Sequence, residues 1–390
     1  MPKFKKAVLF LLVFALLIPC ISFSAAAEAP TLSAEAALLM EADSGQVILE
    51  RNADTRLPMA STTKIMTALV ALELASPETA IAVSPAAVGV EGSSVYLTEG
   101  EVLTLGELLF ALLLESANDA ATAIAIGLAG SVEGFAEEMN RTATTLGLKD
   151  THFTNPHGLD DEEHYTTARE LAILTRAALK NPLLRQIVAT RKTTIPHVGI
   201  ESVRLLINHN KLLRRYDGCI GVKTGFTKRS GRCLVSAAER EGVRLIAVTL
   251  NAPDDWNDHT KLLDHGFSLY KRETLCAAGE YTLALPVVNA TAKAIPVRNA
   301  SALAVTLPRE HPPVSTTVEL PRFTYAPLYE GECLGRVVFR CDLDGDGKAE
   351  IIGEAPLTVE NDLPRKKMRR SFWAWLRSLF GRKNNKESST

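Results

Sequence analysis

The chain has 390 residues, of which 46% are hydrophobic and 23% charged. This balance is typical of a soluble globular protein with two or three domains. The formal net charge is only -2, so the overall charge gives no indication of a nucleic-acid partner.

Residues 1–27 have the pattern of an export signal. A basic start with three lysines is followed by an unbroken apolar run over 7–18 and by three alanines over 25–27. The apolar run is too short for a stable spanning anchor, which is the alternative interpretation. We therefore expect residues 1–27 to be a cleaved signal peptide and the mature chain to be exported.

The region 28–276 has the periodicity of a mixed α+β domain. A strongly apolar helix is predicted from Ser61 to about Ala75. A later helical region is interrupted at 116–119, where Asn118 or Asp119 can cap the second helix. Short apolar runs predict strands at 36–40, 47–50, 220–226, 233–238 and 243–250, with a final helix at 259–270. The simplest assembly is one five-stranded antiparallel sheet flanked by helices.

The composition changes near Ala278. Helical periodicity disappears, and short alternating runs separated by proline and glycine take its place. This pattern predicts a small all-β sandwich domain over 278–362.

The segment 363–383 contains eight Lys or Arg residues and no acidic residue. Its apolar side chains recur on one helical face, at Phe372, Trp375, Leu376, Leu379 and Phe380. A basic amphipathic helix with tryptophan is typical of a segment that lies in a membrane interface. We therefore expect a peripheral anchor to an anionic membrane surface. The alternative is a helix docked on the protein's own surface.

Ser61 and Lys64 open the helix that begins near residue 61. A residue three positions further on lies on the same helical face, so the lysine points back at the serine hydroxyl. A neutral lysine there can accept the serine proton, and the helix N-terminus favours negative charge on the oxygen. The pair is therefore a candidate nucleophile and general base.

Two later stretches strengthen this interpretation: Ser116-Ala117-Asn118 and Lys223-Thr224-Gly225. The first is predicted on a turn between helices and the second on a strand. Together with Ser61 and Lys64 they give S-x-x-K, S-x-N and K-T-G in this order. That is the pattern of penicillin-binding proteins and class A β-lactamases.

Longer segments resemble the low-molecular-weight penicillin-binding proteins that are D-alanyl-D-alanine carboxypeptidases: 58–67, 114–120, 155–159, 166–170 and 221–227. The resemblance covers nearly the whole chain, including the order of signal, catalytic domain, β domain and C-terminal anchor. It implies a serine peptidase that removes the terminal D-alanine from peptidoglycan stem peptides through an acyl-enzyme, without a cofactor. It also implies covalent inhibition by β-lactam antibiotics and a location at the outer face of the cytoplasmic membrane.

The resemblance assigns catalytic roles by position. Ser61 resembles the acylated nucleophile and Lys64 its general base, whose pKa must be lowered by burial and by the charge of Lys223. Ser116 resembles the hydroxyl that passes a proton to the leaving amine. The backbone N–H groups of Ser61 and Phe226 resemble the oxyanion hole.

The remaining positions resemble substrate-binding residues. Asn118 matches the amide that holds the substrate's peptide group. Lys223 and Thr224 match the residues that bind the terminal carboxylate. Gly225 matches the position that lets the substrate backbone approach the strand edge.

Three other functions use the same residues in part. A β-lactamase of class A needs a glutamate with asparagine four residues on, and no glutamate between Asn118 and Lys223 has one. An endopeptidase that cuts cross-links would use the same nucleophile. A wall-binding module with a degenerate site is the non-enzymatic alternative, and the intact motifs argue against it.

Metal sites have weak support in the sequence. His152 and His157 lack any zinc-protease spacing, and the cysteines form no C-x-x-C pair, so we predict no metal in the active site. Residues 342–347 match the first half of a calcium loop, but Gly353 stands where its bidentate glutamate belongs. A turn between two strands explains the same residues.

Overall fold

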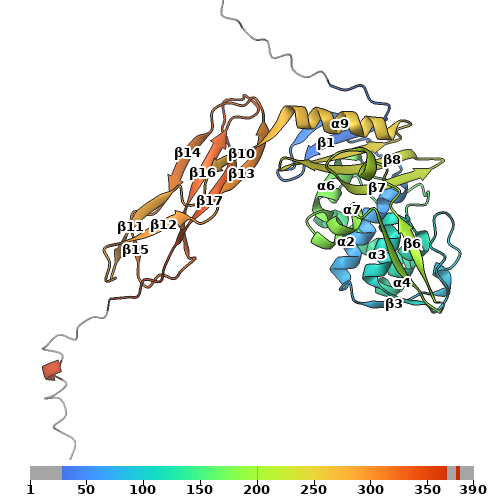
Figure 1. Cartoon of the computed structure of the whole chain (residues 1–390), viewed down its shortest axis with the longest axis horizontal. Coiled ribbons are helices and arrows are strands. Elements are labelled where there is room, and N and C mark those ends of the chain that lie inside the picture. Colours follow the sequence, from blue (N-terminus) through green and yellow to red (C-terminus); the bar gives the residue numbers. More distant parts are fainter. Residues whose placement is uncertain (1–28, 200, 367–374, 378–390) are drawn as a thin grey trace, which may run out of the picture. The chain divides into compact units, whose positions relative to one another are not determined.

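The computed structural model describes residues 29–199, 201–366 and 375–377. The expected signal peptide and most of the expected tail helix lie outside these residues. The chain divides into two compact units, with the main boundary between Leu269 and Tyr270 (Figure 1). Strand β10 (Tyr270–Cys276) pairs with β13 (Leu303–Pro308), which is why the boundary precedes the expected one at Cys276.

The first unit is built on a sheet with the strand order β2-β1-β9-β8-β7. β1 is antiparallel to both β2 and β9, and β7 is antiparallel to β8. The five-stranded antiparallel sheet predicted from the sequence is therefore confirmed. Its strands are β1 Ala36–Glu41, β2 Val47–Arg51, β7 Cys219–Thr227, β8 Gly231–Arg240 and β9 Val243–Leu250.

Helices cover both faces of this sheet. Successive side chains along a strand point to opposite faces, so the apolar central strands need a packing partner on each face. Leu38 of β1 belongs to the core cluster that is shared with the helical region. Its neighbour Leu39 faces α9 (Asp255–Leu269) on the opposite side. Gly266 of α9 lies so close to the sheet that a Cβ there would meet Leu245 Cδ1 at 2.6 Å.

The other helices lie mostly between β2 and β7 in the sequence. They are η1 Ala60–Thr63, α2 Lys64–Leu74, η2 Pro85–Ala87, α3 Leu105–Leu114, α4 Asn118–Ala129, α5 Val132–Thr145, α6 Ala168–Ala178, α7 Pro182–Ala189 and α8 Leu212–Arg215. The apolar α2 is buried over its first eight residues, as its composition predicts. Thr104 and Glu107 form a capping box that starts α3.

Two small hairpins were not predicted from the sequence. β3 (Ala80–Ala82) pairs with β4 (Val102–Thr104), and β5 (Lys192–His197) pairs with β6 (Ser202–Ile207). Arg204 of β6 forms a buried ion pair with Glu101, the residue that precedes β4. The distance between Arg204 Nη1 and Glu101 Oε1 is 2.5 Å. This pair joins the second hairpin to the loop before β4.

The second unit is all-β, as predicted. It has a six-stranded sheet with the order β14-β16-β17-β12-β11-β15, besides the β10–β13 pair. Val297, Val337, Phe339 and Leu357 are fully or almost fully buried in its core. The strands of the larger sheet are β11 Thr282–Val288, β12 Ala294–Asn299, β14 Ser315–Glu319, β15 Thr324–Tyr325, β16 Cys333–Cys341 and β17 Glu350–Val359.

Within the described part of the chain, no helix has the length and hydrophobicity to cross a bilayer. The short helical piece at 375–377 belongs to the expected tail helix, and the rest of that prediction falls outside the described residues.

Candidate active site

Ser61 lies in the tight turn η1, immediately before α2 rather than inside it. The backbone of Ala60 is left-handed, with φ 47°, which turns the chain sharply into the helix. Gly158 packs directly on this turn, and a Cβ there would meet Ala60 O at 2.0 Å. The position of the serine is therefore fixed by backbone packing on the turn that carries it.

Lys64 is the first residue of α2 and has no exposed surface. Its Nζ lies 3.0 Å from Ser61 Oγ, 2.7 Å from Asn118 Oδ1 and 2.6 Å from the carbonyl oxygen of His157. Burial, with the nearby charge of Lys223, holds the pKa of Lys64 well below its ordinary value. A neutral amine can donate to the two carbonyl oxygens and still offer its lone pair to the Ser61 hydroxyl.

Ser116 lies on the turn between α3 and α4, as predicted, in a left-handed conformation with φ 61°. The expectation that Asn118 or Asp119 caps α4 is wrong, because the N-cap is Ala117 and no side chain caps this end. The Asn118 side chain instead bonds Lys64 and donates to Glu91 O at 2.6 Å.

Asp119 holds the loop that borders this turn. Its carboxylate accepts from Ser94 Oγ at 2.6 Å and from the backbone N–H groups of Val95 and Leu97. Gly92 lies in the same loop, where a Cβ would meet Asn118 Nδ2 at 2.7 Å. The loop can therefore close over the asparagine only with glycine at this position.

Lys223 reaches the site from β7 and is 1% exposed. Its Nζ donates to Ser116 Oγ at 3.0 Å and to Thr224 O at 2.8 Å. Burial lowers the pKa of Lys223 to about 7. Two buried amines thus reach the site, one from α2 and one from β7, and each is bonded to one of the two serine hydroxyls.

Gly225 packs against the turn of the nucleophile. A Cβ there would lie 3.1 Å from Ser61 N and 3.2 Å from Met59 O, both tighter than ordinary contacts. Phe226, the next residue, has a side chain that is 65% exposed. A side chain at position 225 would therefore press on the backbone N–H of Ser61.

These residues surround a cleft of about 350 Å³. Of the eight positions singled out from the sequence, five line it directly: Ser61, Ser116, Thr224, Gly225 and Phe226. The other three are buried: Lys64 bonds Ser61, Lys223 bonds Ser116, and Asn118 bonds Lys64. The structure thus brings all eight together.

The cleft has a further wall that the motifs did not indicate: Ser93, His209, Lys211, Arg232, Asp255 and Trp256. Arg232 Nε lies 3.0 Å from Asp255 Oδ1, and its guanidinium stands 5.7 Å from the Trp256 ring centre. Lys211 Nζ lies 5.9 Å from the same centre. No sequence spacing links β8 with the start of α9, so only the fold reveals this wall.

Residues 23–254 match the model of a family described as D-alanyl-D-alanine carboxypeptidase. The chain belongs to this family. The D-alanyl-D-alanine carboxypeptidase DacF of Bacillus subtilis (strain 168) is 31% identical over 342 residues, which is 85% of this chain and 86% of that protein.

Solved structures of the D-alanyl-D-alanine carboxypeptidase family have the same fold. Penicillin binding protein 5 from Haemophilus influenzae is 28% identical, covers 87% of this chain and 99% of its own, and has a TM-score of 0.66. The Streptomyces K15 DD-transpeptidase is 35% identical and covers 62% of this chain and 100% of its own, with a TM-score of 0.59. The family and the fold class predicted from the sequence are thus confirmed.

The histidines near the carboxypeptidase site have structural partners. His164 Nε2 lies 2.8 Å from Thr63 Oγ1, and its Nδ1 accepts from Thr154 N. Burial and the charge of Lys64 lower the pKa of His157 to about 3, so this ring stays neutral. His152 Nδ1 lies 2.6 Å from the carbonyl oxygen of Glu163, on the exposed surface.

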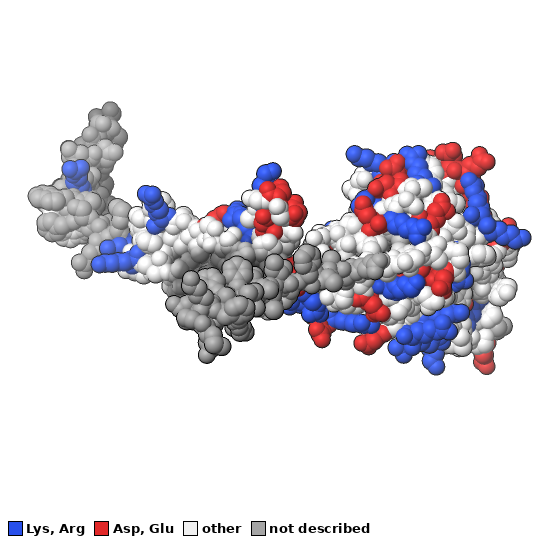
Figure 2. All heavy atoms as spheres, turned by 90° about the horizontal axis from the view of Figure 1, so that it is seen from above, with Lys and Arg blue, Asp and Glu red and all other residues white. Residues whose placement is uncertain are grey.

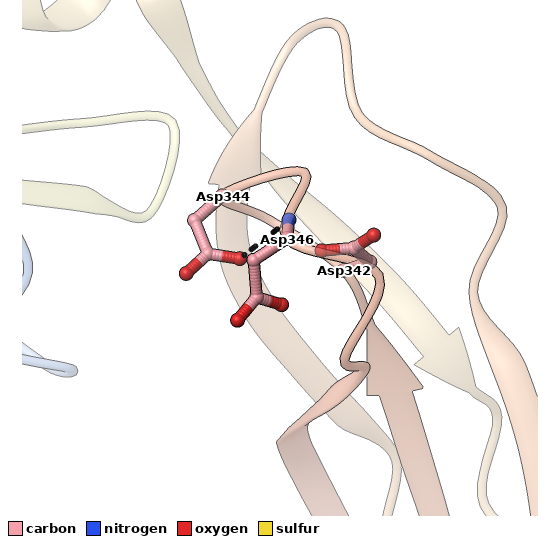
Figure 3. A group of neighbouring side chains, drawn as sticks. All are labelled: Asp342, Asp344 and Asp346. Carbon is pink, nitrogen blue, oxygen red and sulfur yellow. Dashed lines mark hydrogen bonds between the residues drawn. The ribbon is translucent and has the colours of Figure 1, made fainter.

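The calcium-like segment lies in the second unit, in the turn between β16 and β17. These strands are antiparallel neighbours, so the strand-turn interpretation is confirmed. Asp342, Asp344 and Asp346 each place one carboxylate oxygen within 4.8 Å of the others (Figure 3). Asp342 Oδ2 accepts from Gly347 N at 3.0 Å, a bond that spans the turn.

Proposed function

We propose that this protein removes the terminal D-alanine from peptidoglycan stem peptides through an acyl-enzyme on Ser61. The observation that carries the proposal is the 3.0 Å approach of the fully buried Lys64 Nζ to Ser61 Oγ. A buried amine with a lowered pKa is an effective base at neutral pH, and a serine hydroxyl needs such a base to become a nucleophile.

In the acylation step, Lys64 takes the hydroxyl proton as Ser61 Oγ attacks the carbonyl carbon between the two D-alanines. The backbone N–H groups of Ser61 and Phe226 stabilise the oxyanion. The C–N bond then breaks, Ser116 passes its proton to the departing amine, and the protonated Lys64 replaces the proton on Ser116. One proton thus leaves with D-alanine, and the Lys64 amine is neutral again.

In the second step, water attacks the ester that joins the peptide to Ser61. Lys64 again accepts a proton, now from water, and returns it to Ser61 Oγ as the ester bond breaks. The shortened peptide departs with a new carboxylate. Each group therefore ends the cycle in the protonation state in which it began.

Substrate recognition follows from the neighbouring groups. Asn118 holds the peptide group of the substrate, while Lys223 and Thr224 bind its terminal carboxylate. Gly225 leaves room for the substrate backbone at the edge of β7. β-Lactam antibiotics would acylate the same serine, because they also present a carbonyl and a nearby carboxylate.

Hydrolysis of β-lactams as the main activity has less support. None of the eleven residues that line the cleft is a glutamate, and no glutamate between Asn118 and Lys223 has asparagine four residues on. Deacylation then depends on Lys64 and Ser116 alone. An endopeptidase would use the same nucleophile, and a relative from Pseudomonas aeruginosa, 32% identical over 223 residues, is named D-alanyl-D-alanine endopeptidase.

The mature enzyme, as we propose it, acts at the outer face of the cytoplasmic membrane. The export signal at 1–27 supports secretion, and the cations and apolar face of 363–383 support peripheral binding to anionic lipid. In this proposal the catalytic domain ends with α9 at Leu269 and the β domain begins with β10 at Tyr270. Truncation after Asn361 would release a soluble, active enzyme.

The decisive assay compares two acyl-enzymes on one preparation by single-turnover decay. A peptidyl group frees space when its D-alanine departs, whereas a penicilloyl group keeps its leaving group attached and obstructs water. We expect the peptidyl-enzyme to decay over a hundredfold faster, a barrier difference of at least roughly 2.7 kcal/mol. Comparable rapid decay of both would favour a β-lactamase. Cleavage of cross-linked dimers into monomeric peptides, without release of free D-alanine, would favour an endopeptidase.

A further inference from the structure

Three segments of the second unit meet at one end of its larger sheet. Val288 pairs with Tyr325 of the edge strand β15, and Ala326 N donates to Val288 O at 3.1 Å. The turn after β11 also binds the last residues before the tail, because Lys366 N donates to Asn289 O at 2.8 Å. Figure 1 shows β11 and β15 at the end of the unit where this part of the described chain stops.

This end carries apolar side chains that the fold leaves uncovered. Phe323 is 49% exposed, Tyr325 62% and Val288 45%. The two aromatic rings contact each other edge to face, with 5.5 Å between their centres. We call these three residues the aromatic tip. Exposed apolar groups gathered on one surface are typical of an interaction site.

The surroundings of the aromatic tip are cationic. The three segments, 286–297, 320–328 and 363–366, contain Lys293, Arg322, Arg365 and Lys366, all exposed, and no Asp or Glu. In the view of Figure 2, blue and white atoms without red ones cover the left end of this unit. The tail that continues from Lys366 adds further cations and again no acid up to residue 383.

We propose that the aromatic tip is a second membrane contact, which inserts into the headgroup region of an anionic bilayer beside the tail. This inference rests on the proposed anchoring by the tail. Aromatic rings are favoured at the boundary between headgroups and acyl chains, and cations around them are attracted to anionic lipid. Because the tip lies in a folded unit, its insertion would orient the β domain on the membrane, which a tail alone does not do.

Another exposed aromatic residue of this unit provides a matched control. Tyr329 is 63% exposed, but its N–H donates to Glu332 Oε2, and the next residue, Glu330, donates its N–H to Asp362 Oδ1. The carboxylates of Glu332 and Asp362 are therefore bonded to the backbone at Tyr329 and at the next residue, and an anionic surface would repel them. Tyr329 should lie outside the bilayer in the orientation that the aromatic tip imposes.

The test uses the full mature chain and mixed phosphatidylcholine–phosphatidylglycerol vesicles. Phe323→Ser with Tyr325→Ser should lower partition onto these vesicles roughly tenfold, while Tyr329→Ser should leave it unchanged. Unchanged partition of the double variant beside a wild type that binds would overturn the tip contact and leave the tail anchor standing. A wild type that fails to bind would overturn both.

The depth to which the aromatic tip enters the bilayer is measured separately, with fluorescence quenchers attached to the lipids. Tryptophan is introduced as Phe323→Trp or Tyr329→Trp, in full chains that also carry Trp373→Phe and Trp375→Phe to remove the tail signals. We expect brominated acyl chains to quench the probe at 323 and not the probe at 329. Equal quenching of the two probes, or none at 323, would contradict insertion of the aromatic tip even if partition changes.

Discussion

Lys64 Nζ lies 3.0 Å from Ser61 Oγ, and the lysine has no exposed surface. Its other two partners are carbonyl oxygens, Asn118 Oδ1 and His157 O. An ammonium would use three N–H donors here, whereas a neutral amine uses two and accepts the third bond from the serine. Burial, with the charge of Lys223, lowers the pKa of Lys64 and so favours the second arrangement, in which the amine can accept the serine proton.

The first prediction separates the two buried lysines. Lys64→Arg keeps a cation but removes the base, because guanidinium does not lose its proton in proteins. We expect kcat/KM for a D-Ala-D-Ala peptide to fall roughly a thousandfold. Lys223→Arg keeps a cation that can bind a carboxylate and should retain measurable activity. Equal losses in both variants, with circular dichroism unchanged, would contradict the separate roles.

The second prediction concerns pH. Burial lowers the pKa of Lys223 to about 7, so the free enzyme loses this cation as the pH rises through that value. We expect kcat/KM for a peptide with a free terminal carboxylate to decline above about pH 7, because the carboxylate loses its partner. A peptide whose terminus is amidated should not show this decline. An identical decline of kcat/KM with rising pH for the two peptides would argue against Lys223 as the carboxylate partner.

The third prediction tests the close packing at Gly225. In Gly225→Ala the new Cβ would lie about 3.1 Å from Ser61 N, tighter than an ordinary contact. We expect penicillin acylation to slow at least tenfold, because the proposed oxyanion donor is displaced. The control is Phe226→Ala, which removes an exposed side chain and keeps its backbone N–H. If Gly225→Ala acylates at the wild-type rate, this N–H has no such role.

The fourth prediction concerns acid stability. His259 is fully buried between Ser236 Oγ and Thr249 Oγ1, and burial lowers its pKa to about 3. Between about pH 6.5 and this value, the unfolded chain binds a proton that the folded chain excludes. The free energy of unfolding therefore falls as the pH drops, by about 1.4 kcal/mol per pH unit from this group.

The comparison that isolates this contribution uses His259→Gln, which has no titrating ring. Urea midpoints measured at several pH values between 7 and 4 should depend less on pH in the variant than in the wild type, even though the variant is less stable at pH 7. A variant whose stability declines with acid as steeply as that of the wild type would show that another group sets the dependence.

Much of the first unit follows from local sequence patterns. Three apolar runs separated by short turns predicted β7, β8 and β9 to within two residues at each end. Ser116 was correctly expected on a turn between helices, whereas Asn118 of the same tripeptide begins α4. These features depend on residues that are neighbours in the chain, so turn chemistry and periodicity reveal them.

Other features depend on contacts between distant segments. Asn118 does not cap α4 because Lys64 and Glu91 O use its amide, which no local pattern indicates. The pairing of Arg232 with Asp255 joins β8 to the start of α9, and α9 begins there rather than at the expected His259. The sequence motifs thus predicted the residues around the nucleophile, while the wall that contains Arg232 and Asp255 became apparent only from the fold.

The central claim is that Ser61 carries the acyl group. The most direct measurement treats the mature protein with penicillin and maps the adduct by peptide mass spectrometry, with Ser61→Ala as the variant and Ser268→Ala, a serine outside the cleft, as the control. We predict one penicilloyl group per chain on the peptide that contains Ser61, retained in the control and absent from Ser61→Ala. Label that persists on Ser61→Ala, or maps to another residue, would contradict this account.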